Sequence, residues 1–283
     1  MSATSLTWGG RRVPGPGGLP AVAVSLTGPS LAHARAQARS AIGAGADVLE
    51  LRVDLLEETG ALTAAPMDTA AARVLECLQG VGEVANGADA DAGAPLLLTC
   101  RTAVEGGRAH LDDAAYGALL RSVLDGLADW VPERRPAAID VEVQRGCLPQ
   151  VSEQAHGLGI DVVASFHDFE ATPADEALEE VLARMAREGA DLAKIAVWPT
   201  SADDVARLLG VCARATAGAG TGLGVPVAAM SMGALGAVSR VAPAFGSALT
   251  FAVVPDEQGE TRASAPGQMP IQDVRRCLEL LRA

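Results

Sequence analysis

The chain has 283 residues, of which 49% are hydrophobic and only 3% aromatic, and its formal net charge is −13. That length fits one large α/β domain or two ordinary ones, with enough apolar residues for a sizeable core. The negative charge argues against binding to nucleic acid or to an anionic membrane surface, and no apolar run is long enough to span a bilayer, so we expect a cytoplasmic protein.

Short apolar segments alternate with amphipathic helical segments from residue 21 onward. Buried strands are predicted at residues 21–26, 47–53, 95–100, 137–143, 160–165, 191–197, 225–231 and 248–253. Helices are predicted at residues 30–44, 66–79, 112–129, 147–158, 174–188, 202–217, 234–242 and 270–282. Eight such units predict a single α/β domain over residues 1–283, a closed (β/α)8 or TIM barrel. A doubly wound open sheet is the alternative, but it would usually need fewer strands or a second domain.

Two segments fall outside this repeat. Residues 4–13 belong to an N-terminal extension, residues 1–20, and place a Gly9–Gly10 pair between short apolar stretches. We expect them to form a β-hairpin that closes the N-terminal end of the barrel. Residues 80–94 are small, acidic and rich in glycine, which predicts a flexible surface loop.

The cysteines and histidines do not indicate a metal site. The five cysteines are widely spaced, at Cys77, Cys100, Cys147, Cys212 and Cys277, and there are only four histidines. We therefore expect no metal and reduced thiols with no role beyond packing. No glycine-rich phosphate loop follows a predicted strand, so nucleotide binding is not indicated.

Several predicted strands carry charged residues on one face. Because side chains alternate along a strand, Glu50 and Arg52 share a face, as do Asp140 and Glu142. A buried unpaired ion costs on the order of several kcal/mol, so charges inside a barrel are kept only where they are paired or used. A structural salt bridge explains any one pair equally well. Several charges near the C-terminal ends of successive strands indicate a functional site, because barrel enzymes place their chemistry there.

Lys194 is the one lysine of the chain, within the apolar run 192–197, whereas every other basic residue is arginine. A buried amine can lose its proton and act as a Schiff-base nucleophile, which a guanidinium cannot do. A strand-end lysine that reaches toward water is the alternative. His167 follows the preceding predicted strand, and adjacent strands lie about 4.8 Å apart, so the two side chains are within reach of each other.

Three further features follow predicted strands. Glu105 lies in the turn Glu105–Gly107 after the third strand, and Arg240 lies in the stretch after the seventh. The loop Ser264–Gln268 follows the eighth and is either a plain connection or a mobile lid. A solvated acid and a surface arginine would explain the first two just as well when each is taken alone.

Together these features resemble one known family, the type I 3-dehydroquinate dehydratases, over nearly the whole chain. The matching segments are Leu49–Asp54, Thr99–Thr102, Glu105–Gly107, Ser165–Phe169, Lys194–Pro199, Met230–Met232, Ser239–Arg240 and Ser264–Gln268. The resemblance implies a (β/α)8 enzyme that dehydrates 3-dehydroquinate to 3-dehydroshikimate in the shikimate pathway. It also implies that no metal or cofactor is used and that the protein forms a homodimer.

The resemblance further assigns roles to residues. Lys194 would form an imine with the substrate ketone, His167 would be the general acid and base, and Glu105 would orient His167. Arg240 would bind the substrate carboxylate. The rest of the pocket, including the groups that hold the hydroxyls, would be supplied by Ser25, Glu50, Arg52, Arg101, Ser264 and Gln268.

One segment departs from the family pattern, and two other functions remain open. Gly233–Leu235 stands where many bacterial members have Ser-Lys-Thr, which changes the edge of the pocket. A class I aldolase would also need Lys194, but it would want a phosphate site after the last two strands. A non-catalytic binder of small acids would keep the arginines without needing an amine beside His167.

Overall fold

Eight parallel strands curve into a barrel in the computed structural model, which describes residues 5–60, 62, 66–86, 93–217, 222–255 and 263–282. The strands are β3 (Ala21–Leu26), β4 (Val48–Arg52), β5 (Leu96–Thr99), β6 (Ala138–Glu142), β7 (Asp161–Asp168), β8 (Leu192–Val197), β9 (Val227–Ser231) and β10 (Leu249–Ala252). They pair in the order β10-β3-β4-β5-β6-β7-β8-β9. Between β9 and β10, Ala248 N donates to Val227 O at 2.7 Å, so the barrel is nearly closed. An open doubly wound sheet is therefore ruled out.

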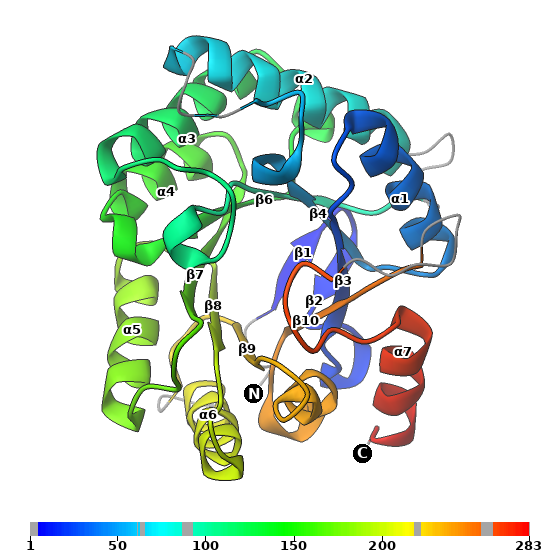
Figure 1. Cartoon of the computed structure of the whole chain (residues 1–283), viewed down its shortest axis with the longest axis vertical. Helices are drawn as coiled ribbons and strands as arrows, with labels where there is room; N and C mark the ends of the chain where they lie inside the picture. The colour runs from blue at the N-terminus through cyan, green and yellow to red at the C-terminus, as the bar shows by residue number, and fades with distance from the viewer. Residues whose placement is uncertain are drawn as a thin grey trace.

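Helices surround this sheet in chain order (Figure 1). They are α1 (Leu31–Gly43), α2 (Met67–Ala85), α3 (Asp113–Leu127), α4 (Leu148–Gly157), α5 (Asp175–Arg187), α6 (Ala202–Ala215) and α7 (Ile271–Leu280). Local sequence starts several of them. At α6, for example, the Ser201 side chain accepts from Asp204 N and the Asp204 side chain accepts from the Ser201 backbone, a reciprocal cap. None of the described helices is long and apolar enough to cross a membrane.

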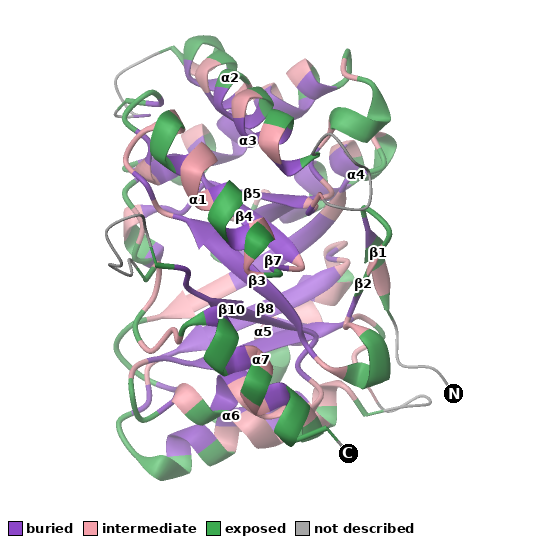
Figure 2. Cartoon of the chain, turned by 90° about the vertical axis from the view of Figure 1, so that its right-hand side faces the viewer, coloured by how far each residue is buried: buried purple, intermediate pink, exposed green. Residues whose placement is uncertain are grey.

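Two layers of buried side chains hold the barrel together. One layer lies between the strands and the helices and includes Leu49, Leu98 and Ile195. The other fills the barrel interior and includes Leu97 and Leu192. Figure 2 shows the result: the barrel strands are mostly buried, and the exposed residues lie mainly on the helices and loops around them. The alternation along each strand divides side chains between the two layers, as the sequence predicts.

The N-terminal hairpin is present and consists of β1 (Leu6–Trp8) and β2 (Arg11–Val13). Gly9 and Gly10 form its turn with φ of 51° and 79°, a conformation that favours glycine. Trp8 is buried in the interior layer, and its indole donates to Asp161, the first residue of β7, at 2.8 Å. The hairpin therefore covers the N-terminal end of the barrel and leaves the opposite end open.

Three predicted boundaries are wrong. Residues 80–85, predicted as loop, continue α2, because Val81 and Ala85 extend its buried face and Gly80 allows Leu31 to approach closely. Residues 87–92 of that predicted loop lie outside the described residues. The segment predicted as a helix at 234–242 instead holds a 3₁₀ turn, Ala237–Val241, because the chain turns tightly at Gly236, where a side chain would lie 2.3 Å from Ser231 O. Strand β7 runs on to Asp168, so His167 lies within a strand rather than after it.

Candidate active site

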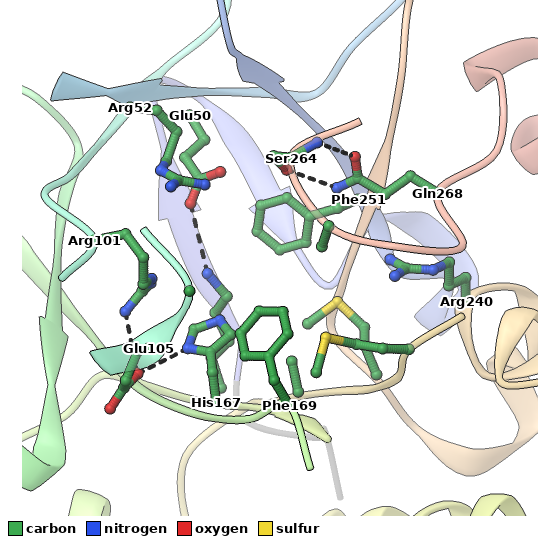
Figure 3. Close-up of a pocket in the computed structure, with 16 residues that line it drawn as sticks. Glu50, Arg52, Arg101, Glu105, His167, Phe169, Arg240, Phe251, Ser264 and Gln268 are labelled. Atoms are coloured by element: carbon green, nitrogen blue, oxygen red, sulfur yellow. Dashed lines mark hydrogen bonds and ion pairs between the residues drawn. The ribbon is translucent and has the colours of Figure 1, made fainter. Parts of the chain in front are cut away.

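A cavity of about 490 Å³, measured with its opening to solvent, lies at the C-terminal ends of the strands (Figure 3). Its polar lining residues come from β4, β7 and β8 and from the loops that follow β5, β9 and β10. They are Glu50, Arg52, Arg101, Glu105, His167, Lys194, Arg240, Ser264 and Gln268. Parallel strands bring these residues together because all their carboxyl ends meet at one face of the barrel. Of the predicted site residues, only Ser25 does not line the cavity.

Lys194 is buried in the wall of this cavity, with 4% of its surface exposed. Its Nζ donates to Asp140 Oδ2 at 3.2 Å and lies 3.5 Å from Glu50 Oε1. The ring of Phe251 lies on another side of the amine, 4.7 Å from Nζ to the ring centroid. The amine is therefore held dry between two carboxylates and an aromatic face, and it does not reach into bulk water.

His167 lies on the strand next to Lys194, two residues nearer the cavity mouth, because Ser165 is the register partner of Lys194. A hydrogen bond of 2.9 Å joins His167 Nδ1 to Glu105 Oε2, drawn as a dashed line in Figure 3. Burial, together with the positive charges of Arg101 and Lys194, lowers the pKa of His167 well below its ordinary value of 6.5. The imidazole is therefore neutral at physiological pH and able to accept a proton.

Glu105 is a protonated partner for this neutral imidazole. Burial raises its pKa to about 8, against the opposing effect of Arg101. The surrounding charges are consistent with that shift, since four buried carboxylates already face four cations in the described part of the barrel. The carboxylates are Glu50, Asp54, Asp140 and Glu142, and the cations are Lys194, Arg52, Arg101 and Arg145. Glu105 contacts one of these cations, Arg101, at 3.4 Å, and that guanidinium is already shared with Asp140 and Glu142.

Two of the predicted substrate-binding arginines are tied to acidic residues of the chain. Arg52 donates two hydrogen bonds of 2.8 Å to Asp54. Arg101 donates to Asp140 at 2.8 Å, to Glu142 at 3.0 Å and to Ser165 at 2.8 Å. Both arginines still line the cavity, but most of their donors are used to organise its floor.

Ser25 supports the pocket from behind. Its hydroxyl donates to Glu50 and accepts from Ser264 Oγ, at 2.9 Å for the second bond. Gln268 makes two hydrogen bonds to Ser264. Its Oε1 accepts from Ser264 N, and its Nε2 donates to Ser264 Oγ, each at 2.9 Å. These bonds connect the loop after β10 to strands β3 and β4, and Ser264 and Gln268 face the cavity (Figure 3).

Arg240 differs from the other arginines in having no acidic partner among the described residues. Only 2% of its surface is exposed, its Nη2 donates to Pro266 O at 2.9 Å, and its Nε has no partner within the described structure. Burial lowers its pKa to about 10. A buried guanidinium with an unused donor, facing a cavity, has the chemistry to bind an anion such as a carboxylate.

Two glycines bring the loops after β9 and β10 into contact. Gly267 has φ of 82°, and a side chain at this position would lie 2.4 Å from Gly233 O. Gly233 N in turn donates to Pro266 O at 3.1 Å. The segment Gly233–Leu235, which departs from the family pattern, therefore helps to seat the loop over the cavity.

Sequence reasoning missed the apolar wall and one carboxylate. Phe169, Phe251, Met230 and Met232 line the cavity, yet nothing in their spacing separates them from ordinary core residues. Alternation along the strand predicts that Asp140 lies on the inner face, but nothing in the sequence assigns it to the site. Its contact with Lys194 depends on the stagger of β6 against β8, which the sequence does not reveal.

Replacing Glu105 by glutamine is expected to make the protein more stable above about pH 8. The raised pKa means that the folded state holds the Glu105 proton more tightly than the unfolded state does. The stability that this proton provides is complete below about pH 4.5 and is lost as the pH rises through about 8. Glutamine cannot ionise, so Glu105→Gln should exceed wild type by roughly 1–3 kcal/mol at alkaline pH and by much less in acid.

Urea unfolding of both proteins in acidic and alkaline buffer measures this difference. Glu133→Gln is the matched control, since it makes the same substitution at an exposed site. A stability difference that stays the same at both pH values would contradict the protonated state of Glu105.

The chain is similar to known proteins along nearly its whole length. The family model described as type I 3-dehydroquinase matches residues 22–283. A 3-dehydroquinate dehydratase of Klebsiella pneumoniae is 36% identical over 264 residues, covering 92% of each chain. One from Albidiferax ferrireducens is 37% identical over 272 residues, covering 94% of this chain and 90% of the relative.

Solved structures give the same likeness. A 3-dehydroquinate dehydratase of Geobacillus kaustophilus has a TM-score of 0.81 at 29% identity, covering 99% of this chain and 97% of its own. A type I 3-dehydroquinate dehydratase of Clostridium difficile, described with covalently modified comenic acid, has a TM-score of 0.78 at 27% identity and covers 99% of both chains.

Proposed function

The chain belongs to the type I 3-dehydroquinases, and on this premise we propose that it dehydrates 3-dehydroquinate to 3-dehydroshikimate through a Schiff base formed at Lys194. The reaction is a step of the shikimate pathway. The single observation that carries the assignment is the buried Lys194 amine, which lines one cavity together with His167 and with Arg240, a guanidinium that has no acidic partner among the described residues. This arrangement combines a nucleophile, a proton carrier and an anion site, as the reaction requires.

Arg240 would bind the substrate carboxylate and place the ketone against Lys194. The amine adds to the ketone carbon, and the carbonyl oxygen leaves as water, so that a protonated imine remains. His167 would carry the protons of this exchange, since a neutral imidazole can accept a proton from the attacking nitrogen and return it to the departing oxygen. Glu105, hydrogen-bonded to Nδ1, would fix the direction of the imidazole.

The protonated imine makes the elimination possible. It withdraws electrons from the neighbouring carbon, so the C2 proton becomes acidic enough for His167 to remove, which gives an enamine. The electron pair of the enamine then expels the β-hydroxyl, and His167 would supply the proton with which it departs as water. Hydrolysis of the imine releases product and restores the amine.

The remaining predicted residues would shape the pocket. Glu50, Arg52 and Arg101 would contact the substrate hydroxyls from the floor, and Ser264 and Gln268 would do so from the loop above. Ser25 would act at one remove, by holding Glu50 and Ser264 in place. Neither an aldolase nor a passive acid binder explains the family match together with a lysine beside a neutral histidine.

Three further properties belong to the same proposal. We infer that the chain works as a single domain, as a homodimer and in the cytosol. All five cysteines are free thiols, which suits a reducing compartment. Leu235, Val238 and Phe245 are exposed apolar residues on neighbouring turns that a second copy would cover.

Borohydride reduction in the presence of 3-dehydroquinate tests the Schiff base directly. Because the chain has one lysine, reduction is expected to add one substrate-derived group to the intact protein. Trypsin should then yield the unbroken peptide 188–207, since a modified Lys194 is no longer cleaved. Protein treated with borohydride but no substrate is the control. An unmodified chain that still turns over substrate would falsify the proposal.

A further inference from the structure

Asp140 on β6 contacts the amine of Lys194 but does not line the cavity, and the roles proposed above leave it unassigned. Its Oδ2 lies 3.2 Å from Nζ. Its Oδ1 accepts from Arg101 at 2.8 Å and from Ser165 at 2.7 Å. The side chain is fully buried, so no water screens its charge. A substrate in the cavity would meet this carboxylate only through Lys194 or Arg101.

We propose that Asp140 is a positioning residue that supplies a fixed counter-charge to the Lys194 nitrogen throughout the reaction, first to the ammonium and then to the protonated imine. The inference rests on the proposed Schiff base. An ammonium and a ketone give a protonated imine and water, so the nitrogen carries one positive charge before and after. Two of its three protons leave with the ketone oxygen as water. The third stays on nitrogen, where Asp140 accepts its hydrogen bond.

The geometry favours Asp140 over Glu50, the other carboxylate near Nζ. Glu50 Oε1 lies farther away, at 3.5 Å, and Glu50 lines the cavity, where a substrate hydroxyl can engage it. Asp140 is out of reach of substrate and is held by donors from three other parts of the barrel, namely Arg101 after β5, Ser165 on β7 and Lys194 on β8. It therefore stays in place while the cavity fills and empties.

The charged groups around the amine are compatible with this role. Besides Asp140 and Glu50, Lys194 faces Arg101 from the β5 side and the His167–Glu105 pair from the mouth. Arg52 also faces the cavity but is bonded to Asp54. Burial acts to raise the pKa of Asp140, but Arg101 and Lys194 more than offset it and hold this pKa below 3.8. Asp140 is thus ionised across the working pH range.

The counter-charge has a kinetic consequence at alkaline pH. Only the protonated imine is a good electron sink, and a nearby negative charge keeps its N–H proton in place to higher pH. Without that charge the imine loses its proton earlier, and elimination stops. Because kcat reports ionisations of the bound complex, the alkaline limb of its pH profile locates this proton loss.

Three variants separate this role from a structural one. In Asp140→Asn we expect kcat to fall by about 10²-fold or more, KM to change little, and the alkaline limb of kcat to move at least about one pH unit lower. Ser165→Ala removes a hydrogen bond to Asp140 without changing any charge. We expect it to lower kcat modestly and leave the limb in place.

Glu50→Gln removes the second carboxylate and is the decisive comparison. It should raise KM, as a substrate-binding residue would, and leave the alkaline limb where it is in wild type. A limb that moves in Glu50→Gln as far as in Asp140→Asn, or one that stays put in Asp140→Asn, overturns the proposal. If thermal unfolding shows that Asp140→Asn does not fold, Glu50→Gln alone still decides, since a limb displaced there assigns the counter-charge to Glu50.

Borohydride trapping of the wild-type protein keeps this test separate from that of the proposed function. No adduct on wild-type Lys194 would mean that the Schiff base itself is wrong. An adduct on wild type, combined with an unmoved limb in Asp140→Asn, would mean that only the role of Asp140 is wrong.

Discussion

Replacing Lys194 by arginine is expected to lower kcat by about 10⁴-fold or more while the protein stays folded. The guanidinium keeps a positive charge between Asp140 and Glu50, so the buried carboxylates remain paired. It cannot form an imine, because it stays protonated and is a poor nucleophile. Steady-state formation of the conjugated product, followed by ultraviolet absorbance, measures the loss.

The same variant has a built-in control in its mass. Lys194→Arg has no side-chain amine at all, so borohydride and substrate should leave its intact mass unchanged. Near-ultraviolet circular dichroism confirms that the fold survives. Turnover at a wild-type rate, or an adduct of the wild-type mass, would show that the chemistry takes place elsewhere.

Replacing His167 by alanine is expected to lower kcat by about 10²–10⁴-fold, because one imidazole serves every proton transfer. Formation of the imine, removal of the C2 proton and hydrolysis of the imine should all slow together. A single-turnover experiment, quenched with borohydride at successive times, follows the trapped adduct. The adduct should rise more slowly than in wild type and also decay more slowly.

His156→Ala is the matched control for this experiment. His156 lies on α4, exposed and paired with Asp191 at 2.8 Å, so its loss removes a histidine without touching the cavity. We expect its rates to equal those of wild type. If His167→Ala eliminates water as fast as His156→Ala does, the proton carrier is another group.

The barrel could be predicted from the repeated alternation of strands and helices in the sequence, but the boundaries of the individual helices and strands could not. Alternation of apolar strands and amphipathic helices indicates eight βα units whatever the details of each junction. The junctions depend on tertiary contacts. A glycine at position 80 favours a loop in the sequence, yet Gly80 lies within α2, where the absence of a side chain makes room for Leu31. Residues 234–242 looked helical, yet the loop after β9 must turn sharply beside Gly267.

The sequence predicts which residues line the site better than it predicts the hydrogen bonds and ion pairs between them. Lys194, His167, Glu105 and Arg240 line one cavity, as their positions near strand ends predict. Sequence does not say which donor meets which acceptor. Arg101, for example, lines the cavity as the sequence predicts, but its ion pairs with Asp140 and Glu142 could not be read from the sequence. Such pairings arise only when the stagger of neighbouring strands sets the depth of each side chain.

The hydrogen bonding of Arg240 affects how the cavity binds its substrate. One nitrogen of the guanidinium, Nη2, donates to Pro266 O, while Nε has no partner among the described residues. An incoming carboxylate can accept a hydrogen bond from Nε without breaking the bond between Nη2 and Pro266 O. We therefore expect that binding of the carboxylate to Arg240 and packing of the loop Ser264–Gln268 over the cavity stabilise each other. A molecule without a carboxylate would lose both the ion pair with Arg240 and the stabilisation of the loop above it.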